Sequence, residues 1–416
     1  MKECTCFGRS AHGCSVVSHG CSVVSHRCSV VHACSAILPI FANGIIHNSL
    51  TLHLTKLSLI NFKNYAQQDV EFSARINCIM GSNGSGKTNL LDAIHYLSFC
   101  KSFFNPVDGQ NILHDAPFMV IQGIYDAEGA EEKIYCGLKR NQKKQFKRNQ
   151  LEYARLSDHI GLFPLVMVSP SDVDLIMEGS DCRRRFIDSV ICQFNKKYLD
   201  TLVYYNKILF QRNATLRGFS ERGVFDRDAL EVWDVQMVDS GEKIHGWRKS
   251  FISDFIPTFK RHYEYISGAK ETVDILYDSQ LNEAGFGMKL KEAVEKDRAF
   301  QYSTVGIHRD DLTFNIGNYP IKKFGSQGQQ KSFLLALKLA EFDFISNIKG
   351  LPPLLLLDDI FDKLDETRVK RLMELVSSEK FGQIFITDTH PDRIAGMFQQ
   401  DAPEVKRFKV ENGNIN

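Results

Sequence analysis

The segment GSNGSGKT at residues 81–88 decides the expected fold. It agrees with the phosphate-loop pattern G-x-x-x-x-G-K-[ST] at every specified position. A short apolar strand pattern at 75–80 comes directly before it, and a segment with an apolar helical face at 90–97 comes directly after it. A strand, a glycine-rich loop and a helix in this order are the context in which a phosphate loop folds.

The residue types of this segment suit a nucleoside triphosphate. Glycines let backbone N–H groups turn toward a phosphate, and the start of the helix adds partial positive charge. Lys87 would reach the β- and γ-phosphates of ATP, and the hydroxyl of Thr88 would bind Mg²⁺. The plainer interpretation is a glycine-rich turn with an exposed lysine. The residues expected to contact the nucleotide are Gly81, Ser82, Asn83, Gly84, Ser85, Gly86, Lys87 and Thr88.

The segment LPPLLLLDD at 351–359 supplies the second half of such a site. Its uninterrupted apolar run is typical of a central strand in a parallel sheet. Asp358, at the end of the strand, would hold Mg²⁺, and Asp359 would act as general base toward the attacking water. The alternative is a strand that merely ends in two solvated acids.

The segment GSQGQQKS at 325–332 has no acid, histidine or cysteine, and it opens the apolar helical run FLLALKLAEF. Ser326 offers a hydroxyl, and Gly328 lets another molecule approach the backbone closely. The free N–H groups at the start of a helix favour an anion. An ordinary helix cap followed by a solvated turn would explain the same composition.

The remaining patterns predict alternating sheet and helix. A strand pattern at 52–59 is interrupted once, at Thr55 and Lys56. Residues 117–168 predict an antiparallel lobe with the strands FMVIQGIYD, EKIYCGLKR and PLVMVS. Apolar residues at 186–209 recur every three or four positions and predict one long amphipathic helix, and a second helical stretch covers 226–268.

These patterns imply a head formed by residues 49–180 and 300–416, interrupted by a mainly helical domain at 181–299. Residues 1–48 differ in kind, because they contain a low-complexity repeat of His and Cys. The spacing of the repeat is unlike that of zinc ligands, so we expect an extension without function. The repeated pairs are His12 with Cys14, His19 with Cys21, and His26 with Cys28.

The composition is that of an ordinary globular protein. The formal net charge is +1, so any binding to nucleic acid would depend on local basic patches. No apolar run approaches the ~18 residues that cross a membrane. Beyond the N-terminal repeat the cysteines are scattered singly, which is typical of buried thiols in a reducing cytosol. We therefore expect a cytoplasmic protein without a membrane partner.

Lys87 and Asp358 are separated by most of the chain, and the GSQGQQKS segment lies shortly before the acidic strand. This is the order of motifs in an ABC-type ATPase head. The chain resembles the RecF family of bacterial recombination-repair ATPases, which is related to SMC proteins. The resemblance covers essentially everything after residue 51. Its motifs are NFKNY at 61–65, GSNGSGKT at 81–88, SPSDVDLIMEGS at 169–180, RRRFID at 183–188, QRNATL at 211–216, GIHRDD at 306–311, SQGQQK at 326–331 and LLLLDDIFDKLD at 354–365.

The resemblance implies an ABC-type P-loop ATPase head with an antiparallel β lobe and an inserted helical lid domain. It implies that two subunits enclose two ATP molecules, each SQGQQK segment packing on the γ-phosphate held by the other subunit. The residues that it assigns to this role are Ser326, Gly328, Gln329 and Asp365. ABC proteins usually carry Asp-Glu where this chain has Asp358 and Asp359, and the shorter acid favours slow hydrolysis. Many ABC heads also have a lid glutamine where this chain reads SPSD at 169–172, so we assign none.

The resemblance further implies a weak, DNA-stimulated ATPase that closes as a dimeric clamp on duplex DNA near single-strand gaps. Such a protein would act with RecR and RecO to load RecA in replication, repair and the SOS response. The alternative is the nucleotide-binding subunit of an ABC transporter, and DNA binding separates the two. An SMC-type structural protein would need long heptad arms, which this chain lacks.

Two basic segments are candidates for contact with DNA phosphates. The first is KRNQKKQFKRNQ, which would otherwise be a solvated basic hairpin, and its cations are Lys139, Arg140, Lys143, Lys144, Lys147 and Arg148. The second opens the inserted domain with Arg183 and Arg184, where the helix dipole disfavours cations. Pairing with Asp181 or Asp188 would explain these arginines equally well.

Two further features remain open in the sequence. The GIHRDD segment at 306–311 either couples the inserted domain to the head or forms an internal ion pair. His390 is either a switch histidine near the nucleotide or a solvated loop residue.

Overall fold

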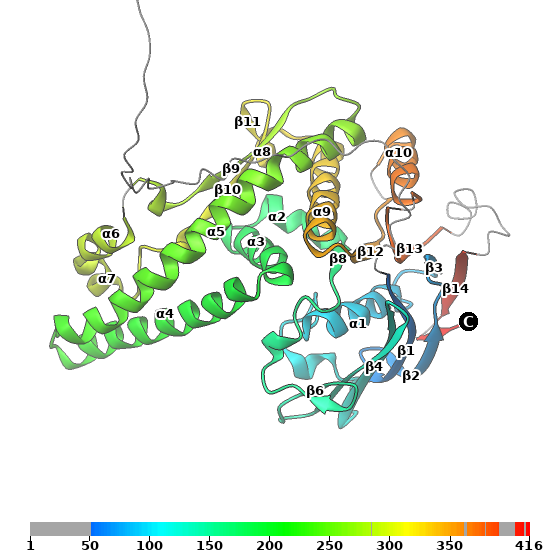
Figure 1. Ribbon diagram of the computed structural model, residues 1–416, viewed down its shortest axis with the longest axis horizontal. Helices are drawn as coiled ribbons and strands as arrows, with labels where there is room; N and C mark the ends of the chain where they lie inside the picture. Colours follow the sequence, from blue (N-terminus) through cyan, green and yellow to red (C-terminus); the bar gives the residue numbers. More distant parts are fainter. Residues whose placement is uncertain (1–50, 284, 362–363, 379, 391–403, 412) are drawn as a thin grey trace, which may run out of the picture. The chain divides into compact units, whose positions relative to one another are not determined.

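The computed structural model describes residues 51–283, 285–361, 364–378, 380–390, 404–411 and 413–416 (Figure 1). The Cys/His repeat of the sequence lies outside these residues. Among the described residues, no helix combines the length and apolar character that crossing a bilayer requires. The cysteines that the structure describes are all free thiols, and four of the five are buried, which confirms the expected burial for those four.

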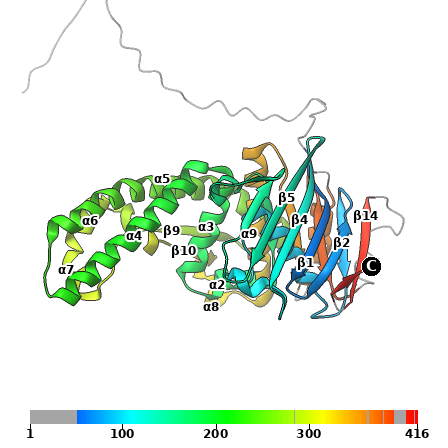
Figure 2. The same cartoon turned by 90° about the horizontal axis from the view of Figure 1, so that it is seen from below.

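The first sheet is antiparallel. Its strands are β1 (Leu52–Phe62), β2 (Tyr65–Glu71), β4 (Phe118–Ala127), β5 (Ala130–Lys139), β6 (Gln145–Arg148) and β7 (Leu151–Glu152), in the order β2-β1-β4-β5-β6-β7. Figure 2 shows β5, β4, β1 and β2 side by side. The predicted interruption of β1 is confirmed, because the pairing with β4 shifts register between Leu54 and Lys56. This bulge lets leucines on both sides of it face the core.

The second sheet is mainly parallel. Its strands are β3 (Ile76–Met80), β8 (Leu165–Val168), β12 (Leu354–Asp358), β13 (Ile384–Asp388), β14 (Val405–Glu411) and β15 (Asn414–Ile415), in the order β15-β14-β3-β13-β12-β8. The run LLLLD forms β12, with parallel neighbours on both sides, as predicted. The assignment of PLVMVS to the antiparallel lobe is wrong, since β8 pairs parallel with β12. All four residues of β8 are buried, which fits a parallel strand rather than an alternating one.

The helix α1 (Lys87–Phe99) packs between the two sheets. It contacts β4 and β5 of the first sheet and β8, β12 and β13 of the second. Leu90, Leu91, Ile94 and Leu97 are buried, as the helical pattern predicted. Lys87, at the end of the phosphate loop, therefore begins a helix that packs against a sheet on each side.

The helical region contains α2 (Asp174–Met177), α3 (Ser180–Phe194), α4 (Lys196–Arg222), α5 (Arg227–Ser267), α6 (Phe286–Glu292), α7 (Val294–Phe300) and α8 (Ile321–Phe324). α4 and α5 lie side by side (Figures 1 and 2). The prediction of a single helix across 186–209 is wrong. The chain is extended at Asn195, whose side chain accepts a hydrogen bond from the backbone N–H of Tyr198 and caps α4. The apolar period continues across this break because α3 and α4 contribute to one core.

In a small sheet, a strand that follows α5 pairs with a strand that lies between α7 and α8. β10 (Asp311–Ile316) pairs antiparallel with β9 (Val273–Asp278) and with β11 (Tyr319–Pro320). Short 3₁₀ helices occur at Asp108–Asn111, Leu156–Asp158, Pro170–Val173, Gln280–Asn282 and Ile307–Arg309. The division into a head and a lid at residues 180 and 300 stays a prediction, and this pairing crosses its second boundary.

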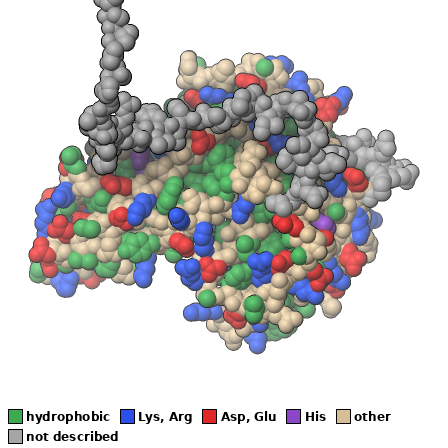
Figure 3. Space-filling model, in the orientation of Figure 1, with side chains coloured by type: hydrophobic (Ala, Val, Ile, Leu, Met, Phe, Trp, Pro, Cys, Tyr) green, Lys and Arg blue, Asp and Glu red, His purple; other side chains and the backbone are tan. Residues whose placement is uncertain are grey.

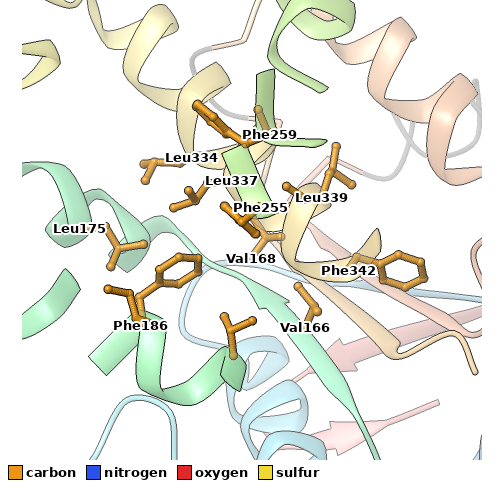
Figure 4. Packing of buried hydrophobic residues seen from close by; sticks show 14 of the residues in the cluster. Val166, Val168, Leu175, Phe186, Phe255, Phe259, Leu334, Leu337, Leu339 and Phe342 are labelled. Atoms are coloured by element: carbon orange, nitrogen blue, oxygen red, sulfur yellow. The ribbon is translucent and has the colours of Figure 1, made fainter. Parts of the chain in front are cut away.

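The helix α9 (Gln327–Lys349) connects the parallel sheet to the helical region, and α10 (Glu366–Val376) follows β12. Figure 4 shows side chains from α9, α5, α3, α2 and β8 packed into one cluster, which includes Leu337, Phe259, Phe186, Leu175 and Val166. The helical region and α9 therefore share one packed core, so a movement of the helical region would displace α9 as well.

Candidate functional site

The loop at 81–86 connects β3 to α1 and needs its glycines for two different reasons. Gly84 and Gly86 have positive φ angles of 78° and 122°, a region that side chains disfavour. At Gly86 a side chain would also collide, because its Cβ would lie 2.5 Å from Nδ2 of Asn64 and 2.9 Å from the hydroxyl of Tyr65. The predicted loop is confirmed as a tight, glycine-dependent turn.

Lys87 is folded over this loop. Its Nζ donates to the carbonyl oxygens of Gly81 at 2.7 Å and Ser82 at 2.9 Å, and the side chain is buried. Burial lowers the pKa of Lys87, while the nearby carboxylates of Asp359 and Asp358 oppose this shift. The exposed-lysine alternative is therefore wrong, since the ammonium group lies inside the loop.

The two residues expected to hold Mg²⁺ are brought together. Oγ1 of Thr88 lies 3.1 Å and 3.0 Å from the two carboxylate oxygens of Asp358. Thr387, on the neighbouring strand β13, donates a hydrogen bond of 2.7 Å to Oδ1 of Asp358. Burial raises the pKa of Asp358, and these two hydroxyls act against that shift. A hydroxyl and a carboxylate are oxygen ligands of the kind that Mg²⁺ prefers, so these residues fit the ion.

Asp359 turns the chain sharply where β12 ends. Its φ of 46° is uncommon for a residue other than glycine, although aspartate is among those that tolerate it. Its backbone N–H donates to Oγ1 of Thr387 at 3.0 Å, so one threonine contacts both acids. The sequence reasoning missed Thr387, although a polar residue near the end of the apolar strand IFITD was a usable signal.

The NFKNY segment supports the loop from outside, a role that the sequence reasoning did not assign. Asn64 donates from Nδ2 to the carbonyl oxygen of Ser85 at 3.1 Å and accepts from Asn89 of α1 at 2.7 Å. Tyr65 is buried and donates from its hydroxyl to the carbonyl oxygen of Gly86 at 2.9 Å. The hairpin between β1 and β2 thus fixes the end of the phosphate loop.

The GSQGQQKS segment opens α9 as predicted. Ser326 is the N-cap, and its Oγ accepts from the backbone N–H of Gln329. The side chain of Gln329 in turn accepts from the N–H of Ser326 at 2.7 Å and donates to Glu271 at 2.9 Å. Within the described residues, these polar partners lie on α9 and at Glu271 rather than in the loop at 81–88. Ser326 is exposed, so its own subunit leaves it accessible.

Asp365 begins α10. Its Oδ1 accepts from the backbone N–H of Arg368 at 2.9 Å, and its Oδ2 pairs with Nε of Arg368 at 3.2 Å. The carboxylate remains more than half exposed. Its role in a partner's ATP site stays a prediction.

Upstream of the helical region, the segment SPSD at 169–172 contributes to a buried ion cluster. Asp172 accepts from the N–H of Ser169 and lies 3.4 Å from Nζ of Lys338 on α9. Glu341 lies 3.3 Å from the same ammonium group. Burial raises the pKa of Glu341 to about 7, and the lysine acts against that shift. One buried cation therefore faces two carboxylates.

The first basic segment lies on the hairpin of β5 and β6, and three of its cations bond within the chain. Nζ of Lys144 lies 2.8 Å from Asp108, and Arg148 pairs with Glu132 through two nitrogens. Arg140 donates to two backbone carbonyl oxygens and Lys147 lies over the ring of Tyr135, whereas the side chains of Lys139 and Lys143 are exposed. On the face seen in Figure 3, basic and acidic side chains are interspersed.

The arginines at the start of α3 form internal ion pairs. Arg183 pairs with Asp311 at 2.7 Å, and Arg184 pairs with Asp181 and donates to the carbonyl oxygen of Asp310. Asp310 is fully buried and lies 2.8 Å from Nη1 of Arg248 on α5. The GIHRDD segment thus forms internal ion pairs. Because α3 and α5 belong to the predicted inserted domain and Asp310 and Asp311 to the predicted head, the same pairs also couple these two parts, so the two alternatives do not exclude each other.

His390 comes just after β13. Its backbone N–H donates to Oδ1 of Asp388 at 2.8 Å, while its ring is mostly exposed. Its role as a switch stays untested. In the parts of the chain that the structure describes, no group of three or more His, Cys, Asp or Glu side chains is arranged to hold a metal ion.

Comparisons with known proteins agree with this geometry. The family described as RecF/RecN/SMC N terminal domain matches residues 53–414. The DNA replication and repair protein RecF of Phocaeicola vulgatus is 53% identical over 364 residues, which is 87% of this chain and 97% of that relative. The RecF protein of Flavobacterium johnsoniae is 49% identical over 359 residues, covering 86% of this chain and 100% of that relative.

Solved structures give the same result. A structure described as the recombination mediator protein RecF-ATP in the RecFOR pathway has a TM-score of 0.81 and 29% identity, covering 90% of this chain and 99% of that one. The Smc head domain of Pyrococcus furiosus has a TM-score of 0.52 at 16% identity, which shows a shared fold alone. The ABC-type ATPase head fold is confirmed, and the transporter interpretation is not favoured. Since the family match and the relatives cover almost the whole described chain, this protein belongs to the RecF family.

Proposed function

We propose that this protein is an ATPase of DNA replication and recombinational repair that acts as an ATP-dependent DNA clamp. The observation that carries the proposal is the contact between Thr88 and Asp358 beside a loop that encloses the ammonium group of Lys87. Residues from opposite ends of the chain form this contact, and a nucleotide phosphate with its metal ion explains why they meet.

In this proposal the loop at 81–88 binds the triphosphate through backbone N–H groups and Lys87. Thr88 and Asp358 hold Mg²⁺, which screens the phosphate charge when bound. Asp359 orients and deprotonates the attacking water. Its carboxylate is one methylene shorter than the usual glutamate, so hydrolysis is slow and serves as a timer.

The clamp consists of two subunits that enclose two ATP molecules. The exposure of Ser326 at the start of α9 supports this, because the helix N-terminus is open to a second molecule. Gly328, Gln329 and Asp365 complete the surface that would meet the partner's γ-phosphate. Solved RecF structures carry ATP or an ATP analogue in their descriptions, which supports ATP as the ligand.

Duplex DNA near single-strand gaps is the proposed substrate of the clamp, and binding DNA stimulates hydrolysis. The exposed cations Lys139 and Lys143 are the better candidates for phosphate contacts, since Lys144, Arg148, Arg183 and Arg184 have partners within the chain. The description of a similar structure as part of the RecFOR pathway supports RecR and RecO as partners. RecA loading and the SOS response are the proposed outcome of their joint action. We place this work in the cytoplasm, where the free thiols remain reduced.

The test is ATPase activity with and without duplex DNA, in the wild type and in Lys87→Arg. DNA should stimulate the wild type, and the variant should lose both basal and stimulated activity. Light scattering should show an ATP-induced dimer that persists in Asp359→Asn. Equal activity in wild type and Lys87→Arg, or monomers with ATP in both wild type and Asp359→Asn, would contradict the proposal.

A further inference from the structure

Arg368 joins the two segments that the proposed dimer would present to a partner. It lies in the first turn of α10, and its Nε is 3.2 Å from Oδ2 of Asp365. The far end of the same guanidinium group reaches the first turn of α9. A Cβ placed on Gly328 would lie 2.8 Å from Nη1 of Arg368. One side chain therefore contacts both the acid at the start of α10 and the backbone beside Ser326.

This contact gives Gly328 a specific purpose. Gly328 lies inside α9 and has ordinary helical backbone geometry, so it does not serve a left-handed turn. Its missing side chain makes room for the arginine instead. Even alanine at this position would displace the guanidinium group by steric contact.

The position of Arg368 is electrostatically unusual. The start of α9 carries partial positive charge, which disfavours a cation next to it. Arg368 is nevertheless mostly covered, with its side chain 17% exposed. Among the described residues, its one ion-pair partner is Asp365, which is itself largely exposed. Glu271, which also contacts the first turn of α9, is already bonded to Gln329 and Tyr263.

We infer that Arg368 is a positioning residue of the two-subunit ATP site. Its guanidinium group holds the backbone at Gly328 and the carboxylate of Asp365 at a fixed separation, so that both reach the partner's nucleotide together. A planar group with several N–H donors suits this bridging better than a flexible ammonium group does. The inference rests on the proposed ATP-dependent dimer and adds a residue that acts on the other subunit's site.

The first test compares Arg368→Gln with Lys370→Gln, a matched change at an exposed position of the same helix. ATP binding to the monomer should stay within about twofold of wild type in both, because the loop at 81–88 is untouched. ATP-induced dimerisation, followed by light scattering against protein concentration, should weaken roughly tenfold or more in Arg368→Gln alone. Arg368→Lys keeps the charge and should show a smaller loss, which also covers the case in which the glutamine variant does not fold.

The deciding test uses mixed dimers. Asp359→Asn and Arg368→Gln chains should each be nearly inactive alone. In a mixed dimer, the loop and Asp359 of one chain face an intact Arg368 from the other, so one complete site exists. At protein concentrations that saturate dimerisation of both variants, an equal mixture should therefore recover roughly a quarter of wild-type activity, because half of randomly formed dimers are mixed and each has one complete site.

The outcomes distinguish a failure of the role inferred for Arg368 from a failure of the proposed ATP-dependent dimer. A mixture no more active than its components would show that Arg368 acts on its own subunit, and the inference would fall while the dimer stands. Unchanged dimerisation in Arg368→Gln would have the same meaning. A wild type that stays monomeric with ATP would instead contradict the proposed function itself.

Discussion

The hydroxyl of Thr387 donates a 2.7 Å hydrogen bond to Asp358 and accepts one of 3.0 Å from the backbone N–H of Asp359. A single side chain on β13 thereby orients both acids at the end of β12. This arrangement matters because Asp358 is buried, and a buried carboxylate depends on its donors for stability.

Thr387→Val keeps the shape of the side chain but removes both hydrogen bonds. We expect ATPase activity to fall about tenfold and the free energy of unfolding to fall by about 1–2 kcal/mol, since Asp358 and the N–H of Asp359 lose a partner. Steady-state hydrolysis and urea unfolding measure the two effects. Thr313→Val, at an exposed position of β10, should change neither. An active Thr387→Val protein would show that Thr88 alone holds Asp358 in place.

Tyr65→Phe removes the hydroxyl that supports the phosphate loop at Gly86. The carbonyl oxygen of Gly86 still accepts its helical hydrogen bond from the N–H of Leu90. The free energy of ATP binding should therefore weaken only modestly, by about 0.5–1.5 kcal/mol. We expect this loss as a several-fold weaker affinity for ATP with kcat nearly unchanged, measured by titration with a fluorescent ATP analogue. Tyr319→Phe, at an exposed tyrosine, is the control. Unchanged ATP affinity would mean that Asn64 and Asn89 are sufficient to hold the loop.

Glu341→Gln should stabilise the protein at alkaline pH. Because burial raises the pKa of Glu341 to about 7, its contribution to stability is fully present below about pH 4.5 and is lost as the pH rises through 7. The variant leaves Lys338 with the single carboxylate of Asp172, a balanced pair. Relative to wild type, its free energy of unfolding should rise by roughly 1–3 kcal/mol between pH 5 and pH 8.

Denaturant unfolding at both pH values checks this prediction, with Glu221→Gln at an exposed position of α4 as the control. A difference between variant and wild type that does not change with pH would show that Glu341 keeps one protonation state across this range.

Arg212→Met should destabilise the helical region strongly. Arg212 is fully buried and lies 2.6 Å from both Asp297 and Asp234, so the variant leaves the buried Asp297 without its cation. The free energy of unfolding, measured with urea, should fall by about 3–5 kcal/mol. Arg217→Met, exposed on the same helix, should lose little. Adding Asp297→Asn should recover part of the loss, and no recovery would point to packing rather than charge as the cause.

The parts of the site that consist of consecutive residues could be predicted from the sequence. The glycine loop, the strand that ends in Asp358 and the cap at Ser326 are local patterns, and all three are found. The partners that complete the site come from elsewhere in the fold. Thr387 and Tyr65 lie on strands that reach the site only through the order of strands in the two sheets. The local sequence pattern of a strand does not specify that order.

Two errors in the fold have the same origin. The apolar pattern of PLVMVS indicates a strand but not its neighbour, so β8 was assigned to the wrong sheet. The helical spacing across 186–209 shows which residues face the core. One continuous helix and two helices that pack on the same core give the same spacing, so the spacing does not distinguish them. The break at Asn195 depends on a single cap, which the period cannot reveal. The internal pairing of Arg183 likewise needs β10, far along the chain.

The order of strands in the parallel sheet has a consequence for biosynthesis. β13 lies between β3, which leads into the phosphate loop, and β12, which ends in Asp358. The carbonyl oxygen of Ser85 also accepts a hydrogen bond from the backbone N–H of Gly413, which follows β14. On the ribosome, the loop therefore emerges well before β12 and β13, the strands that place Asp358 and Thr387 beside it. ATP cannot template the folding of the nascent chain, and a premature stop before β13 should leave an unfolded product for proteolysis rather than a partly active ATPase.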